Sequence, residues 1–236
     1  NFVIYDQDDQ LQLIKRCLVD LNLDAQVYNP RAIRHQIEEW KNKGQVPQDI
    51  EPSAFDMTER KALDVYKHYR QRCLESNAVD FGDMILHTVN LIRRVPEVRD
   101  TCHQQWSHIL VDEYQDTNPV QYQLLRALTT ESHSLTVVGD DDQSIYRWRG
   151  ADIGNILRFE NDFTRAKVIR LEQNYRSTAI ILEAANAVIS NNSSRKGKTL
   201  FTDGERGNTI NFAVFPSERD EADAIARGID DHLDND

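Results

Sequence analysis

Residues 108–119 decide the fold class, and they read His-Ile-Leu-Val-Asp-Glu-Tyr-Gln-Asp-Thr-Asn-Pro. The apolar run 108–111 predicts a short buried strand, because buried parallel strands are continuous hydrophobic runs. Asp112 and Glu113 follow directly, so we expect both carboxylates at the carboxyl edge of a parallel sheet, where open α/β folds bind ligands. One carboxylate can hold Mg²⁺ there, and its neighbour can polarise an attacking water.

The chain after residue 104 alternates between strand and helix patterns. Further strands are expected at 135–138, 168–171 and 209–215, and helices after Pro119, at 178–190 and after Ser217, which pairs with Asp220 as a cap. The first two of these strands are short apolar runs, so they are expected to be buried. This alternation predicts a parallel sheet with crossover helices.

The first hundred residues are mainly helical in pattern. Apolar residues at three- and four-residue steps predict helices over 8–23, 31–41 and 58–75, with Asp8 or Asp9 as the cap of the first. A fourth helix is expected to begin at Asp80, with Asp83 as its capping partner. The stretch 42–56 contains Gly and two Pro without periodicity, so it reads as a loop.

A second polar segment, residues 139–150, reads Gly-Asp-Asp-Asp-Gln-Ser-Ile-Tyr-Arg-Trp-Arg-Gly. Gln143 can sense a phosphate or orient a water. Tyr146 and Trp148 lie two residues apart with arginines beside them, a pattern that suits stacking on the bases of a single strand. Core packing is the alternative interpretation of these aromatics, and the charged flanks weaken it.

A third segment, residues 171–177, reads Leu-Glu-Gln-Asn-Tyr-Arg-Ser after the run 168–171. Tyr175 could stack on a nucleobase. Arg176 could neutralise charge on a transferring phosphoryl group, as an arginine finger does. Taken alone, an arginine in a surface salt bridge is the simpler interpretation.

The net charge of −11 argues at first against a polyanionic partner, but the charge is unevenly distributed. Residues 201–236 carry ten acids and three bases, which is −7 of the total. Residues 60–72 carry five bases and one acid. A nucleic-acid surface is therefore allowed locally, while the solvated face of a helix explains the basic run equally well.

Cysteine usage and hydropathy restrict the setting. Cys17, Cys73 and Cys102 are far apart and odd in number, so we expect small buried side chains in a reducing cytoplasm rather than a disulfide framework or a zinc site. No apolar run approaches the roughly 20 residues that cross a bilayer, so no membrane partner is expected. The chain opens at Asn1 without a leader, which suggests a processed chain or a piece of a longer one.

The three segments together resemble the motifs of superfamily 1 DNA helicases of the UvrD, PcrA and Rep type. The matching strings are VDEYQDTN, GDDDQSIYRWRGA and LEQNYRS, in that order. The resemblance extends to IYDQDDQ at 4–10, AVDFGDM at 78–84 and RRVPEV at 93–98, and so covers nearly the whole chain.

The resemblance implies a set of roles around ATP. Asp112 would help to hold Mg²⁺, Glu113 would activate water as the base, and Gln143 would contact the γ-phosphate region. Arg149 would lie near the nucleotide and the acids. From the second lobe, Tyr175 would stack on adenine and Arg176 would reach the γ-phosphate; these two continue the nucleotide site.

The resemblance also implies the DNA partner and the architecture. Tyr146 and Trp148 would stack on bases of single-stranded DNA, which the enzyme would follow in the 3′ to 5′ direction up to duplex junctions. The expected fold is α/β, a RecA-like parallel sheet portion with an all-helical insert and the start of a second RecA-like lobe. The expected divisions are 1–103 for the insert, 104–167 for the rest of the first lobe and 168–236 for the second.

One family feature is missing from the sequence. A phosphate-binding loop should precede Asp112, yet the single Gly-Lys-Thr is at 197–199, after the other motifs and without a strand before it. The chain is therefore interpreted as an internal fragment of an ATP-dependent helicase of DNA repair or replication, inactive alone as an ATPase. Two alternatives stay open: a non-catalytic DNA- or protein-binding module derived from a helicase, and the helicase part of a helicase–nuclease.

Overall fold

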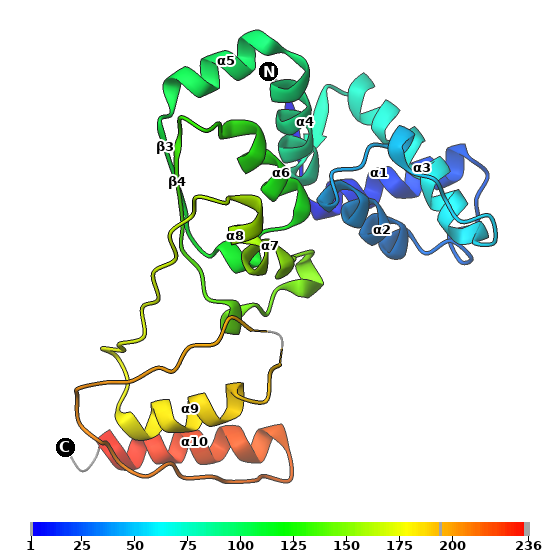
Figure 1. Ribbon diagram of the computed structural model, residues 1–236. Coiled ribbons are helices and arrows are strands. Elements are labelled where there is room, and N and C mark those ends of the chain that lie inside the picture. The colour runs from blue at the N-terminus through cyan, green and yellow to red at the C-terminus, as the bar shows by residue number, and fades with distance from the viewer. Residues whose placement is uncertain (1, 194, 234–236) are drawn as a thin grey trace. The chain divides into compact units, whose positions relative to one another are not determined.

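The computed structural model describes residues 2–193 and 195–233, which form two compact units (Figure 1). The first unit spans Asn1–Ala166 and the second spans Lys167–Asp236. The chain is a mixed α/β protein with many helices and two short parallel sheets.

Three helices of the first unit enclose its main core: α1 (Gln7–Asp20), α2 (Pro30–Asn42) and α3 (Met57–Glu75) (Figure 1). Their apolar stripes meet in a cluster of aliphatic and aromatic side chains, in which Trp40 stacks on Tyr66 with ring centroids 5.9 Å apart. The predicted helices are confirmed, but the predicted cap of the first is wrong. Asp6 caps α1, because its carboxylate accepts hydrogen bonds from the backbone N–H groups of Asp8 and Asp9.

A short parallel pair connects the ends of this helical region. β1 (Val3–Tyr5) lies beside β2 (Ala78–Asp80), and the sequence predicted neither, since three residues are too few to show alternation. The helix predicted to begin at Asp80 is α4 (Phe81–Arg94), and its capping pair with Asp83 is present on both sides. α5 (Pro96–Gln105) follows.

The capping acids of α4 also hold a buried lysine. Lys41 Nζ lies 2.5 Å from an Asp80 carboxylate oxygen and 2.7 Å from one of Asp83, and all three side chains are buried. The Tyr69 hydroxyl donates to the same Asp80 oxygen at 2.8 Å. This network therefore joins α2, α3 and α4 inside the protein.

The second sheet of this unit consists of β3 (His108–Val111) and β4 (Ser134–Val137), which are parallel and in register from His108–Ser134 to Val111–Val137. α6 (Pro119–Leu128) connects them and packs on α4 around Val89 and Val120. The predicted strands and their parallel pairing are confirmed, but their predicted burial is wrong. Leu110 is 77% exposed, because no third strand or covering helix lies on that face among the described residues.

Short elements complete the first unit. They are the helices α7 (Gly154–Leu157) and α8 (Phe159–Asp162) and single 3₁₀ turns at Pro47–Asp49, Tyr114–Asp116, Asp141–Gln143 and Arg147–Arg149. The first of these turns lies within the stretch that the sequence predicted to be a loop.

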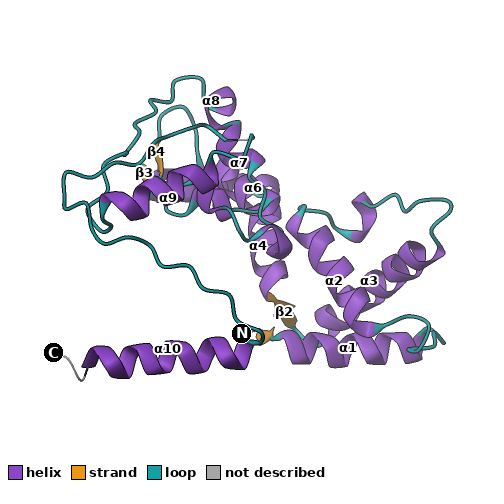
Figure 2. Cartoon of the chain, turned by 90° about the horizontal axis from the view of Figure 1, so that it is seen from below, coloured by secondary structure: helices purple, strands orange, loops and turns teal. Residues whose placement is uncertain are grey.

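The second unit contains two helices, α9 (Ala179–Ile189) and α10 (Glu218–Leu233), separated largely by loop (Figure 2). The expected cap of the last helix is present, since the Asp220 N–H donates to the Ser217 hydroxyl. The strands predicted at 168–171 and 209–215 do not form among the described residues. In the part of this unit that the structure describes, neither segment has a neighbouring strand, and the one strand-type pairing is an isolated bridge between Gln173 and Phe201.

The cysteines and the hydropathy have simple structural outcomes. Cys17 and Cys73 are buried in the helical core as expected, whereas Cys102 is half-buried on α5. None of the helices in the described part of the chain is long and apolar enough to cross a membrane.

Candidate functional site

The carboxyl ends of β3 and β4 lie side by side, which brings two of the predicted polar segments together. The Val138 N–H donates to the Val111 carbonyl at 2.8 Å, and the Tyr114 N–H donates to the Val138 carbonyl at 2.9 Å. These bonds continue the parallel register past the ends of both strands. Asp112 and Glu113 therefore leave the sheet at the same edge as the loop that begins at Gly139.

Asp112 and Glu113 are both exposed to solvent at this edge. An Asp112 carboxylate oxygen accepts a hydrogen bond from the Glu113 N–H at 2.9 Å, which fixes the first carboxylate against the turn. Glu113 has φ 50° and ψ 44°, a left-handed conformation that costs a non-glycine residue on the order of 1 kcal/mol or more. The left-handed residue turns the chain from β3 into the 3₁₀ turn Tyr114–Asp116.

The loop after β4 carries Gln143 in a 3₁₀ turn that Asp140 caps. The Asp140 carboxylate accepts hydrogen bonds from the Asp142 N–H at 3.1 Å and from the Gln143 side-chain amide at 2.8 Å. Gln143 is exposed, but this second bond limits its rotamers. Its amide is therefore held beside the carboxyl end of β4.

The same loop carries the two aromatics and an arginine that lies across them. The ring centroids of Tyr146 and Trp148 are 6.3 Å apart, with 51° between their planes. The Arg149 guanidinium carbon lies 4.8 Å from the Tyr146 ring and 4.6 Å from the Trp148 ring, a cation–π arrangement with both. Trp148 is 68% exposed, so core packing does not explain it.

Gly150 ends this loop at a position that requires glycine. Its φ is +90°, and a Cβ atom there would lie 2.7 Å from the Asn42 side-chain nitrogen. Asn42 is the last residue of α2, and its side chain also accepts a hydrogen bond from the Asn118 amide at 2.9 Å. The aromatic loop is thus seated on the end of a helix of the same unit.

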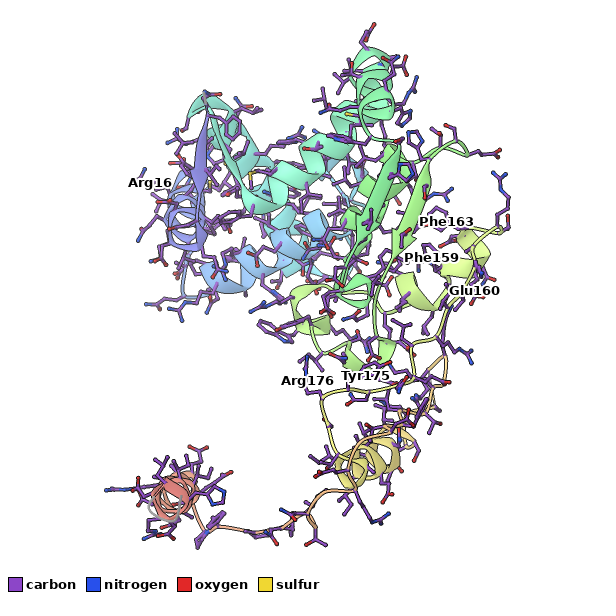
Figure 3. The ribbon with its side chains drawn as sticks, turned by 90° about the vertical axis from the view of Figure 1, so that its left-hand side faces the viewer. Arg16, Phe159, Glu160, Phe163, Tyr175 and Arg176 are labelled. Atoms are coloured by element: carbon purple, nitrogen blue, oxygen red, sulfur yellow. The ribbon has the colours of Figure 1, made fainter. Side chains whose placement is uncertain are left out.

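Buried and half-buried side chains pack beside the turn after β3. Tyr114 is buried and meets Phe159 edge-to-face, with centroids 5.5 Å apart, and Phe159 lies beside Phe163 at 4.6 Å (Figure 3). Burial raises the pKa of the Tyr114 hydroxyl to about 12, so this residue stays neutral. The fully buried Asn155 donates from its amide to the Thr117 carbonyl and hydroxyl.

Tyr175 and Arg176 belong to the second unit, in the loop that precedes α9 (Figure 3). The Tyr175 ring is 86% exposed, and its hydroxyl donates to the Gln173 side chain at 2.7 Å. The Asn174 side chain caps the turn by accepting from the N–H groups of Arg176 and Ser177. Both predicted residues are therefore displayed to solvent by a hydrogen-bonded turn, and the salt-bridge interpretation of Arg176 finds no partner among the described residues.

The residues fit part of a nucleotide–metal complex. A single carboxylate at a sheet edge matches the way Mg²⁺ is usually held, by one or two acids together with phosphate and water oxygens, and Asp112 is such a group. No cluster of three or more His, Cys, Asp or Glu side chains lies within metal-binding reach in the described ranges 2–193 and 195–233. Gly197-Lys198-Thr199 lies in loop with no helix directly after it, so it lacks the helix N-terminus that binds phosphate.

Sequence reasoning missed Gln115 and Asn42 as parts of this site. Gln115 is only 1% exposed, and its amide lies between Glu113 and the loop after β4. The available signal was an amide residue two positions after the second of the two acids. Asn42 gave no signal, because its contacts with Gly150 and Asn118 join segments far apart in sequence.

Comparison with known proteins identifies the family. Residues 1–164 match the UvrD/REP helicase N-terminal domain, and residues 169–236 match the UvrD-like helicase C-terminal domain. The chain belongs to the UvrD/REP helicase family. The step between the two matches falls where the two compact units meet in the chain, at residues 166 and 167.

Two relatives show how much of this family's length is present. The ATP-dependent DNA helicase PcrA of Staphylococcus aureus (strain Mu50) is 46% identical over 235 residues, which is 100% of this chain and 32% of the relative. PcrA of Staphylococcus epidermidis (strain ATCC 35984) is 45% identical over 232 residues, 98% of this chain and 32% of the relative. The chain therefore spans about a third of the length of the curated relatives it matches.

Proposed function

We propose that this chain is part of an ATP-dependent DNA helicase that couples ATP hydrolysis to 3′–5′ movement along single-stranded DNA and to unwinding at duplex junctions. The observation that carries the proposal is the shared edge of β3 and β4. The acids of one strand end and the Gln143–Trp148 loop of the other leave the sheet side by side there. Family membership supports the same activity.

The nucleotide roles are assigned to groups that the structure displays to solvent. Asp112 would hold Mg²⁺, which would supply electrostatic stabilisation of the phosphates when bound. Glu113 would accept the proton of the attacking water, and Gln143 would contact the γ-phosphate region. From the second unit, Tyr175 would stack on adenine and Arg176 would reach the γ-phosphate. The fixed turns around these residues support such roles, because preorganised groups lose little freedom on binding.

The DNA roles are assigned to the exposed aromatic pair. Tyr146 and Trp148 present ring faces of a kind on which unpaired bases stack. Arg149 now covers parts of both rings. The same guanidinium was expected near the nucleotide. A base that stacks on the rings would therefore displace it, and a phosphate near Asp112 would attract it. This movement of Arg149 offers a simple link between strand binding and the nucleotide.

The proposal includes the architecture that the family resemblance implied. The helical insert would span 1–103, the remainder of the first RecA-like lobe 104–167, and the opening of a second RecA-like lobe 168–236. The parallel pairing of β3 with β4 and the helical core of α1–α3 support this division. The proposal also includes a location in a reducing cytoplasm and a role in DNA repair or replication.

The DNA arm of the test uses the chain itself with a fluorescently labelled single-stranded oligonucleotide at low salt. We expect binding that quenches tryptophan emission, and we expect Trp148→Ala to weaken it by about 1–3 kcal/mol, the value of one base–aromatic stack. Trp106→Ala is the matched control, since Trp106 is 43% exposed but lies between α5 and β3. Equal losses in both variants would contradict the DNA role of Trp148.

The ATP arm compares the chain with the complete protein to which it belongs. The chain alone is expected to show no ATP turnover with or without single-stranded DNA, because no phosphate-binding loop is present in it. The complete protein is expected to hydrolyse ATP, and Glu113→Gln is expected to lower its kcat by about 10²–10⁴-fold, as for loss of a general base. Robust turnover by the chain alone would overturn the proposal for the isolated chain, and unchanged kcat in Glu113→Gln would overturn the role of Glu113.

A further inference from the structure

Gln115 is a buried side chain that uses both ends of its amide. It lies in the 3₁₀ turn after β3 and is 1% exposed. Its Nε2 donates to Glu113 Oε2 at 2.7 Å, and its Oε1 accepts from the Asp140 N–H at 2.9 Å. Since a buried amide is stable only when its polar atoms are paired, these two bonds fix its position.

The bonds of Gln115 belong to a longer chain of contacts. Asp140 takes part in two of these contacts. Its backbone N–H donates to Gln115, and its carboxylate accepts from the Gln143 amide at 2.8 Å. The carboxylate of Glu113 is thereby connected to the amide of Gln143 through two intervening residues. This route joins the turn after β3 to the loop after β4 through side chains.

The backbone around Gln115 is shaped to admit this side chain. A Cβ atom at position 139 would lie 2.7 Å from Gln115 Oε1 and 3.1 Å from the Tyr114 backbone nitrogen, so only glycine leaves enough room. The left-handed backbone of Glu113 turns its carboxylate back toward the same amide. The lack of a side chain at Gly139 and the left-handed backbone of Glu113 therefore both accommodate the Gln115 side chain.

No other common side chain of this length reproduces the two bonds. A glutamate at 115 would keep an acceptor for the Asp140 N–H but would present a second negative charge to Glu113 instead of a donor. A methionine would keep the volume and lose both bonds. The arrangement therefore requires an amide for its chemistry and not only for packing.

We infer that Gln115 is a positioning residue that holds the Glu113 carboxylate in register with the loop carrying Gln143. Through this loop it connects the position of Glu113 to strand binding at Tyr146 and Trp148. The inference rests on the proposed role of Glu113 as the base. Gln115 is buried, so its action in this inference runs through the two residues to which it is bonded.

The test is a double-mutant cycle on kcat in the complete protein, with variants at Gln115 and Glu113. Gln115→Met is expected to lower kcat by about 100-fold, the cost of a reacting group misplaced by about 1 Å, with the KM for ATP changed less than about threefold. The ratio of DNA-stimulated to basal turnover is also expected to fall. In a Glu113→Gln background the same substitution is expected to have no further effect on kcat, since residues that act as a unit are not additive.

Gln123→Met provides a matched control. Gln123 also uses both ends of its amide, toward the Lys43 carbonyl and from Arg93, and it also lies against a glycine, Gly44. It lies on α6, outside the two loops, so its loss is expected to leave kcat within about twofold. If the two methionine variants have equal thermal midpoints, lower stability does not explain a loss of kcat that occurs only in Gln115→Met.

Gln115→Glu is the second variant, because it keeps the size of the side chain and the acceptor for Asp140. It is expected to fold and to lose kcat as Gln115→Met does. Normal kcat in either variant, or equal losses in the Glu113 and Glu113→Gln backgrounds, would overturn the inference. If both Gln115→Met and Glu113→Gln kept a normal kcat, the proposed function itself would be overturned.

Discussion

Hydrophobic segments are buried in the first unit of the molecule and largely exposed in the second. In the first unit, the apolar stripes of α1, α2 and α3 meet each other and are buried. In the second unit, Leu182 is the only buried hydrophobic side chain among the described residues, and Ile169 and Phe212 are 70% and 90% exposed. A helix makes its backbone hydrogen bonds within itself, whereas a strand needs a neighbour for them. Helical patterns are therefore fulfilled locally, and strand patterns depend on what lies beside them.

The largest expected effect is at the buried charges of the first unit. Lys41→Met is expected to lower the free energy of unfolding by about 3–5 kcal/mol, because it leaves Asp80 and Asp83 buried without their cation. Urea unfolding followed by tryptophan fluorescence measures this. Lys61→Met is the control, since Lys61 pairs with Asp64 in a partly exposed bridge worth about 0–1 kcal/mol. Equal losses of unfolding free energy in the two variants would contradict the expectation that the buried ion pairs of Lys41 matter more than the partly exposed pair of Lys61.

A matched leucine pair compares the two units directly. Leu63→Ala removes a core side chain of α3 and is expected to cost about 2–5 kcal/mol. Leu171→Ala removes a side chain that is 77% exposed in the second unit and is expected to cost less than about 0.5 kcal/mol. Urea unfolding of both variants measures the difference. A large loss at Leu171 would show that the strand predicted at 168–171 forms in solution.

The smallest expected effect is the pH dependence of the same buried network. Burial alone favours neutral Asp80, but the Lys41 ammonium and hydrogen bonds from Lys41, Asp83 and Tyr69 hold the pKa of its carboxyl below the ordinary value. A lowered pKa in the folded state stabilises the protein above the unfolded pKa of about 3.9, and this contribution is lost as pH falls through the folded value.

The measurement is the difference in unfolding free energy between wild type and Asp80→Asn. It is expected to change by less than about 1 kcal/mol between pH 7 and pH 4 and to shrink only below that. A difference that disappears near pH 6, or that grows on acidification, would contradict the assigned direction of the pKa shift.

The sequence predicted the parts of the fold that depend on neighbours along the chain. The α4 start at Asp80 is of this kind. The β3–β4 pair was predictable for another reason, because a helix between two apolar runs indicates a parallel crossover. Lys41, by contrast, occupies a helix position that looks solvated, and its partner Asp80 lies 39 residues away. Contacts at such separations depend on how helices pack, which periodicity alone does not specify.

The candidate site divides in the same way. The convergence of the Asp112 and Gln143 loops follows from strands that end at one edge, so it was predictable. The stacking of Arg149 on Tyr146 and Trp148 and the amide bridge of Gln115 depend on rotamers and on a left-handed residue, Glu113. Neither rotamers nor that conformation can be read from the order of residue types.

The burial of two cysteines gives the protein selective thiol chemistry. Burial raises the pKa of the Cys17 thiol to about 11 and that of the Cys73 thiol to about 12, so almost no reactive thiolate exists at either position at neutral pH. Cys102 lies half-buried on α5, outside that core. Alkylating reagents and mild oxidants should therefore mark Cys102 while the protein is native, and reach the other two only when the α1–α3 bundle opens.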